Sequence, residues 1–254
     1  MLLIVIVFIF VLIAIGLTWF FLAKDKGTKE PVSALWIALG FGLLGAVAAG
    51  FVESLIIPIK ALSGGPIGEV LLASLGVGII EEFFKFVPLA LFIYHKSYFN
   101  EHTDGVIYFA IAGLGFGIPE NILYSVQFGA HAAILRLFLT PIFHAATTGF
   151  VGYFLIKSKI DHKPLYKTGL ALAFAMVIHG LYDFGLSSGN TIFAIMSFMI
   201  TFGMSVGLFI LYARATELDK EQGLSVVGNN SFCRSCGTNN PNHNLYCAHC
   251  GKYA

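Results

Sequence analysis

Charged residues are scarce in this sequence. Asp, Glu, Lys and Arg make up 11% of the 254 residues, whereas 57% are hydrophobic, and the mean hydropathy is +0.82. This composition excludes an ordinary soluble domain and is typical of an integral membrane protein. The formal net charge is only +1, so the chain has no strong basic field for nucleic acid and no strong acidic field for cationic partners.

Cysteine is absent from the hydrophobic part of the chain. All four cysteines fall in the last 22 residues, which predicts a small second module there. Lys and Arg are absent before the first apolar run, residues 2–23. A secretory signal normally has basic residues at that point, a shorter apolar core and a small-residue cleavage site. We therefore expect this run to be a retained helix.

Long apolar segments predict the fold class. A helix needs about 20 predominantly apolar residues to cross a hydrocarbon core of about 30 Å. Segments long enough to do so, allowing for tilt, recur along the chain. We therefore predict an all-α polytopic membrane protein with about seven transmembrane helices in contact with lipid. The segments are residues 2–23, 33–58, 67–94, 105–128, 132–156, 168–186 and 191–212.

Loop lysines predict the orientation, because Lys and Arg concentrate on the cytoplasmic side. The loops after the first, third and fifth segments together contain eight lysines, whereas the connections between them contain Lys60 alone. We expect the N-terminus outside and the C-terminal module in the cytoplasm. The cytoplasmic set is Lys24, Lys26, Lys29, Lys96, Lys157, Lys159, Lys163 and Lys167, with Arg214 and Lys220 after the seventh segment.

Polar residues interrupt four of these segments. A charged side chain at the bilayer centre costs roughly 2.5 to 3.5 kcal/mol on insertion scales. Several charged groups at similar depth are therefore expected to meet each other or an internal aqueous cavity. The candidate site residues are Glu81, Glu82, Lys85, Glu120, Asn121, His144, His179 and Asp183.

Spacing supports this convergence. Glu81 and Lys85 are one helical turn apart, as are His179 and Asp183, so each pair shares a helix face. Glu82 is turned by about 100° from Glu81. One carboxylate can then act on water while the other holds a histidine or braces the packing. Three alternatives stay open: a structural ion pair, a proton relay in a transporter, and a scaffold whose charges fix helix register.

Four short motifs resemble those of the PrsW family of intramembrane proteases. Glu81-Glu82-Phe83-Phe84-Lys85 resembles the EExxK signature, and Phe116-Gly117-Ile118-Pro119-Glu120-Asn121 resembles the FGxxEN signature. His144 and the step from His179 to Asp183 resemble its later histidine motifs. The resemblance covers residues 34–212. It implies a peptidase distantly similar to the type II CAAX prenyl endopeptidases. It also implies a membrane-protein substrate, such as a single-pass regulator of the anti-sigma type.

Peptide hydrolysis needs an activated water, a proton for the leaving amine and stabilisation of the oxyanion. We expect Glu81 to be the general base, kept ionised by Lys85. Glu82 is expected to support Glu81, and His144 and His179 to orient the water or stabilise the oxyanion. Asp183 would set the tautomer of His179, and Asn121 would donate a hydrogen bond to the tetrahedral intermediate. Glu120 is a candidate without an assigned role.

A zinc-dependent version uses the same residues, because two imidazoles and a carboxylate form a catalytic zinc site. The sequence has no HExxH motif, which removes the most specific local signal for zinc. We favour the metal-free glutamate mechanism and leave the catalytic metal open. Glu53, near the end of its apolar segment, is interpreted as a solvated residue without a role.

The C-terminal cysteines have the spacing of a zinc ribbon. Cys233-x2-Cys236 and Cys247-x2-Cys250 are separated by ten residues, and two such pairs can enclose a tetrahedral Zn²⁺. Two disulfides are the alternative, which a reducing cytoplasm disfavours. We predict a transmembrane peptidase domain at 1–212, a linker at 213–231 and a ribbon at 232–254.

The ribbon is expected either to dock a protein partner or to serve as a structural cap. Nucleic-acid contact is not favoured, because the basic residues of the ribbon are Arg234 and Lys252.

Overall fold

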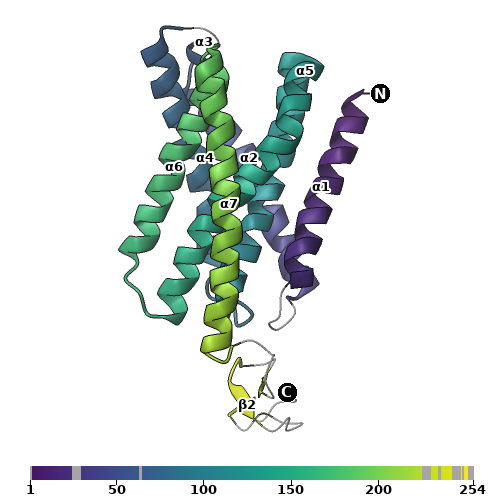
Figure 1. The fold of residues 1–254 in the computed structure, drawn as a ribbon, viewed down its shortest axis with the longest axis vertical. Coiled ribbons are helices and arrows are strands. Elements are labelled where there is room, and N and C mark those ends of the chain that lie inside the picture. The colour runs from purple at the N-terminus through teal and green to yellow at the C-terminus, as the bar shows by residue number, and fades with distance from the viewer. Residues whose placement is uncertain are drawn as a thin grey trace.

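The computed structural model describes residues 2–24, 30–62, 65–224, 230–233, 236–241, 247, 249 and 250. It is a helical bundle with a two-stranded antiparallel sheet beyond one end (Figure 1). This confirms the predicted fold class. The helices are α1 (Leu2–Lys24), α2 (Val32–Ile56), α3 (Ile59–Leu62), α4 (Ile67–Phe92), α5 (His102–Ile160), α6 (Tyr166–Ser187) and α7 (Thr191–Glu221), and the strands are β1 (Asn230–Phe232) and β2 (Asn239–Pro241).

The helix α5 folds back on itself. A straight helix of this length would place Gly105 and Gly152 about 70 Å apart at about 1.5 Å per residue. In the structure the backbones of these glycines are in contact, as are those of Gly113 and His144. The two arms, His102–Tyr124 and Leu139–Ile160, therefore lie side by side. They correspond to the fourth and fifth predicted segments, although the helical backbone continues between them.

Five segments of the described chain are long and apolar enough to cross a membrane. Their outward faces carry large apolar side chains, such as Trp36 and Ile192, which are 67% and 74% exposed. Apolar surface of this extent is stable against lipid rather than water. The protein is therefore an integral multi-pass membrane protein. The five segments are Val32–Ile56, His102–Tyr124, Leu139–Ile160, Tyr166–Ser187 and Thr191–Glu221.

The helix α4 is not among these five because it carries four charged residues, Glu69, Glu81, Glu82 and Lys85. It packs against α6 and α2 inside the bundle. Burial against protein rather than lipid explains how Glu81, Glu82 and Lys85 are tolerated at membrane depth.

Close backbone contact brings α4 and α6 together at the polar residues. A Cβ atom on Gly78 would lie 2.5 Å from the backbone nitrogen of Gly180, so neither helix leaves room for a side chain there. Gly78 is three residues before Glu81, and Gly180 follows His179. The small residues therefore set the distance between the acidic helix and the histidine helix.

The helix α7 continues to Glu221, so part of the predicted linker is helical. Arg214 pairs with Glu217 at 3.0 Å, and buried Asp219 accepts hydrogen bonds from the start of α5. These contacts provide partners for polar side chains in the part of the chain that the sequence predicts to be a linker. Residues 225–229 of the predicted linker lie outside the described residues, and the domain boundaries stay a prediction.

Candidate active site

Buried polar side chains from α4, both arms of α5 and α6 meet inside the bundle. None of the residues that carry them is more than 8% exposed. The convergence expected from insertion cost is therefore present in the structure. The set is Glu81, Glu82 and Lys85 from α4, Glu120 and His144 from α5, and His179 and Asp183 from α6.

Lys85 is the centre of this cluster. Its Nζ atom donates to Glu82 Oε1 at 2.9 Å, to Glu81 Oε2 at 3.2 Å and to His144 Nδ1 at 2.8 Å. The ammonium group has three protons, so these three acceptors use all of them. Nζ also lies 4.1 Å from the centre of the Phe116 ring, within cation–π range. Lys85 therefore contacts Glu81 and Glu82 of α4 and a histidine of α5.

The hydrogen-bond partners indicate the tautomer of each histidine. Lys85 can only donate, so His144 Nδ1 accepts and His144 Nε2 donates to Glu120. His179 Nδ1 donates to Glu82 Oε1 at 2.7 Å. The other nitrogen of His179, Nε2, lies 3.3 Å from Glu81 Oε2. Each imidazole is thus held by a carboxylate on one side and faces the centre of the cluster with its other nitrogen.

The sequence-predicted partner of His179 makes the longer contact. Asp183 Oδ2 lies 3.4 Å from His179 Nε2, whereas Glu82 forms a hydrogen bond of 2.7 Å with Nδ1. Asn121 is buried beside Glu120.

Thr147, which the motifs do not include, donates to Glu82 Oε1 at 3.1 Å. The one feature of the sequence that could have indicated a role for Thr147 is its position three residues after His144.

Negative charge exceeds positive charge in this cluster. Glu81, Glu82, Glu120 and Asp183 are four carboxylates, and Lys85 is the one Lys or Arg side chain that contacts them in the described part of the chain. Uncompensated charge is costly in a low-dielectric interior. The excess negative charge of this cluster can be neutralised by protonation of the carboxylates or by a bound cation.

The residues present fit a divalent cation in place of the Lys85 ammonium, which donates to Glu81 and His144. Glu81, His144 and His179 each place one ligand atom within 4.8 Å of the others. Two imidazoles and a carboxylate are the donor set of a catalytic zinc site, and the carboxylates of Glu82 and Glu120 behind the imidazoles match the usual support of metal ligands. His179 Nε2, buried without a hydrogen-bond partner in the described part of the chain, is turned toward Glu81.

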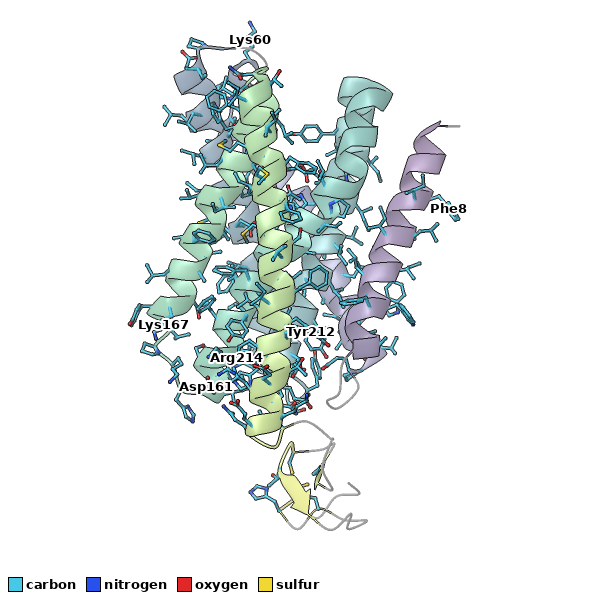
Figure 2. The ribbon with its side chains drawn as sticks, viewed as in Figure 1. Phe8, Lys60, Asp161, Lys167, Tyr212 and Arg214 are labelled. Atoms are coloured by element: carbon cyan, nitrogen blue, oxygen red, sulfur yellow. The ribbon has the colours of Figure 1, made fainter. Side chains whose placement is uncertain are left out.

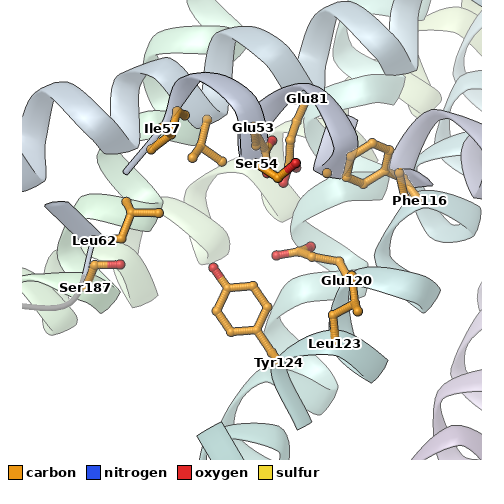
Figure 3. A pocket seen from close by; sticks show the side chains of 13 residues that line it. Glu53, Ser54, Ile57, Leu62, Glu81, Phe116, Glu120, Leu123, Tyr124 and Ser187 are labelled. Atoms are coloured by element: carbon orange, nitrogen blue, oxygen red, sulfur yellow. The ribbon is translucent and has the colours of Figure 1, made fainter. Parts of the chain in front are cut away.

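A cavity of about 250 Å³ borders the cluster. Figure 3 shows Glu53 and Glu81 on one side of it and Glu120 and Tyr124 on the other. The rest of its lining is mainly apolar, which suits a segment of polypeptide with apolar side chains. Glu81 and Glu120 are therefore the two members of the buried cluster that line the cavity.

Glu53 belongs to this cavity, which corrects its interpretation as a solvated residue. Its Oε1 atom is buried and has no hydrogen-bond partner among the described residues. The sequence signal for a role of Glu53 was that it is the one charged residue in the apolar run of α2. Its position near the end of that run predicted a place at the membrane surface. In the structure, residues of α4 and α5 line the same cavity as Glu53.

The four cysteines form a second group beside the β1–β2 hairpin. Their Sγ atoms all lie within 4.8 Å of one another, and the Cys233–Cys250 and Cys236–Cys247 distances are both 3.5 Å. Thiolates at about 2.3 Å from one tetrahedral ion are about 3.8 Å apart, so this arrangement fits a structural metal. All four cysteines are free rather than joined in disulfides.

The fold and the buried centre together define a polytopic helical membrane protein with a carboxylate–histidine site next to a cavity. Residues 30–250 match the family model described as "PrsW family intramembrane metalloprotease". The chain belongs to this family, which confirms the resemblance seen in the motifs. It is therefore a membrane peptidase. The family description includes a metal, whereas the sequence motifs favoured metal-free chemistry.

Individual relatives agree with this assignment. The chain is 31% identical over 189 residues to Protease PrsW of Bacillus subtilis (strain 168), covering 73% of this chain and 85% of the relative. It is 32% identical over 196 residues to Protease PrsW of Oceanobacillus iheyensis, covering 74% and 86%. No solved structure matches the chain.

Proposed function

We propose that the chain cleaves a peptide bond of a membrane-protein substrate, with Glu81 as the general base. The observation that supports this most directly is the position of Glu81. Its side chain borders the cavity and also contacts Lys85 and His179. A substrate segment in the cavity would meet a carboxylate whose charge and orientation are controlled from the buried side.

The reaction follows from these positions. The Glu81 carboxylate takes a proton from a water molecule, and the resulting hydroxide attacks the carbonyl carbon of the peptide bond. The tetrahedral intermediate collapses as the C–N bond breaks, and the proton held by Glu81 passes to the leaving nitrogen. The Lys85 ammonium, 3.2 Å from Glu81 Oε2, favours the ionised form of Glu81 that accepts this proton.

The surrounding residues have supporting roles in this proposal. Glu82 holds His179 through the 2.7 Å hydrogen bond, so that Nε2 is directed at Glu81. Glu120 holds His144 in the same way. His144, His179 and Asn121 orient water or stabilise the oxyanion, and Asp183 supports His179 from the next turn of α6.

A metal-dependent version is favoured by two observations: the excess of carboxylates and the convergence of Glu81, His144 and His179. When bound there, a zinc ion would lower the pKa of a water ligand and polarise the substrate carbonyl. Glu82 and Glu120 would then hold the two imidazole ligands in place.

Metal stoichiometry separates the two versions. With the metal-free mechanism, we expect one zinc per full-length chain, bound by the ribbon, and none in a Cys233→Ser/Cys236→Ser variant. Cleavage of a membrane substrate should then survive a strong chelator. The measurement is elemental analysis of both purified proteins together with a cleavage assay. A zinc that remains in the cysteine variant, with cleavage lost on chelation, would establish the metal-dependent version instead.

The ribbon is proposed to bind structural Zn²⁺ through Cys233, Cys236, Cys247 and Cys250. So short a segment depends on the metal for folding. The lysine-rich end of the bundle lies on the same side as the ribbon, opposite Lys60 (Figure 2). This distribution supports a cytoplasmic ribbon and an outside N-terminus. A cytoplasmic ribbon is in position to dock a protein partner.

Glu53 is proposed to contact the substrate, because its side chain lines the cavity opposite Glu120. Replacing it with Gln should raise KM by about tenfold, the loss expected for a hydrogen bond to a charged group, while kcat changes less. Michaelis–Menten kinetics on a reconstituted substrate measure this. An unchanged KM would show that the substrate does not reach Glu53.

The substrate is expected to be a membrane protein, of which a single-pass regulator is one example. Membrane proteomes of cells carrying the active protein and the Glu81→Gln variant test the proposal. A membrane protein should accumulate uncut with the variant, provided that both enzymes are present at equal abundance. Equal cleavage in both cells would contradict the assignment of Glu81.

A further inference from the structure

A second cavity lies at the lysine-rich end of the bundle, between the end of α5 and the start of α6. Its volume is about 300 Å³. Tyr153 and Phe154 form its aromatic part, and the side chains of Lys157, Lys163 and Lys167 line the rest. Figure 2 places Lys167 at this end, far from Lys60. The cavity is separate from the one beside Glu81, with which it shares no lining residue.

The local sequence explains why the lysines gather here. Helix α5 ends at Ile160, and His162 adopts a left-handed backbone conformation with φ 52°. This turn brings the chain back, so that the Lys163 N–H donates to the Lys157 carbonyl at 3.4 Å. Helix α6 then begins at Tyr166, and Lys167 lies in its first turn. The turn thus collects lysines from two helices and their connection on one side.

Positive charge is in excess at this cavity. Lys157 pairs with Asp161 at 3.6 Å, and its Nζ lies 5.4 Å from the centre of the Tyr153 ring. Asp161 is shared with His102 at 3.1 Å and with Gln222 at 2.9 Å. Partial burial raises the pKa of the Asp161 carboxyl, but these hydrogen bonds lower it by more, so it stays ionised.

Neither of the other two lysines has an acidic partner within salt-bridge distance in the described part of the chain. Lys163 and Lys167 are both exposed. Two of the lysines that line the cavity therefore carry unneutralised ammonium groups at its edge, which is the charge that a phosphate-bearing ligand requires.

An apolar seam continues from the cavity into the membrane. Phe154 contacts Phe150 with ring centres 5.1 Å apart, and Phe150 contacts Phe174 of α6 at 5.3 Å. Phe174 is 46% exposed and Leu170, one turn earlier, is 65% exposed. A ligand with an anionic head and an apolar tail matches both parts. Free phosphate would use the lysines and leave the seam unused.

We propose that this cavity binds the headgroup of an anionic glycerophospholipid, whose acyl chains lie along the Phe150–Phe154–Phe174 seam. A basic pocket between transmembrane helices near the cytoplasmic surface is a recurring form of lipid recognition. The site holds together the ends of α5 and α6, the helices that carry His144 and His179. The proposal does not depend on the proposed function.

Native mass spectrometry of the full-length protein in detergent tests the lipid site. Dioleoylphosphatidylglycerol is titrated into the wild type, into Lys163→Gln/Lys167→Gln and into the matched control Lys96→Gln/Lys220→Gln. The control removes two exposed lysines from the same end that do not line the cavity. We expect the cavity variant to bind the lipid roughly 30-fold more weakly, from the attraction of each lysine to anionic lipid. The control variant should bind like the wild type.

Two further ligands identify the source of the phosphate. Dioleoylphosphatidylcholine should bind weakly to all three proteins, and inorganic phosphate should bind more weakly than the anionic lipid. Equal losses in the two double variants would overturn the proposal. Tight binding of phosphatidylcholine, or of inorganic phosphate at the affinity of the lipid, would also overturn it. Circular dichroism of all three proteins checks that the substitutions leave the helices intact.

Discussion

Replacing Glu81 with Gln is expected to lower the rate of substrate cleavage by at least about 100-fold, the usual contribution of general-base catalysis. Glutamine keeps the size of the side chain and its contact with Lys85 but cannot accept the proton of water. Because Glu81 borders the cavity, the loss should appear in kcat rather than in substrate binding. A cleavage assay with the full-length protein and a membrane substrate in the same vesicles measures it.

Glu69→Gln is the matched control. Glu69 lies on α4, as Glu81 does, but is exposed in the first turn of that helix and lines neither cavity. The same chemical change at this position should leave the cleavage rate within about twofold, as for a surface substitution away from the site. If both variants cleave at the wild-type rate while folded, Glu81 is not the base.

The pairing within α4 was predictable because it is local. A helical repeat of 3.6 residues fixes Glu81 and Lys85 on one face, and the structure joins them at 3.2 Å. The cost of charge in lipid then predicted that groups on other helices would meet them, as His144 and His179 do. The free-energy cost of burying a charge predicts that each charged group has a partner, but it does not predict which atoms form the contact.

The finer arrangement depends on helix packing, which spacing does not encode. Glu82 rather than Asp183 forms the hydrogen bond with His179, because the contact between Gly78 and Gly180 fixes the relative height of α4 and α6. The position of Glu53 beside the cavity also requires α2, α4 and α5 to be assembled. Similarly, the polar end of α7 is helical because Asp219 accepts hydrogen bonds from the start of α5, a partner distant in sequence.

Replacing Lys85 with Met should lower the free energy of unfolding by about 3 to 5 kcal/mol, the cost of removing one partner of a buried ion pair. Methionine keeps the apolar stem and its volume, so the loss reports charge rather than a cavity. Lys60→Met, at an exposed position outside the cluster, should change stability by less than about 0.5 kcal/mol. Unfolding in mixed detergent micelles, followed by circular dichroism, measures both variants.

A second substitution tests whether the loss comes from uncompensated carboxylates. Glu82 is the closest carboxylate to the ammonium group, at 2.9 Å, and is fully buried. Glu82→Gln removes the charge that Lys85→Met leaves unpaired, so the double variant should be more stable than Lys85→Met alone. The double-mutant cycle should then give an interaction energy of about 1 to 3 kcal/mol. Additive losses would mean that Lys85 stabilises the fold through its other contacts, with Glu81, His144 and the Phe116 ring, rather than by neutralising Glu82.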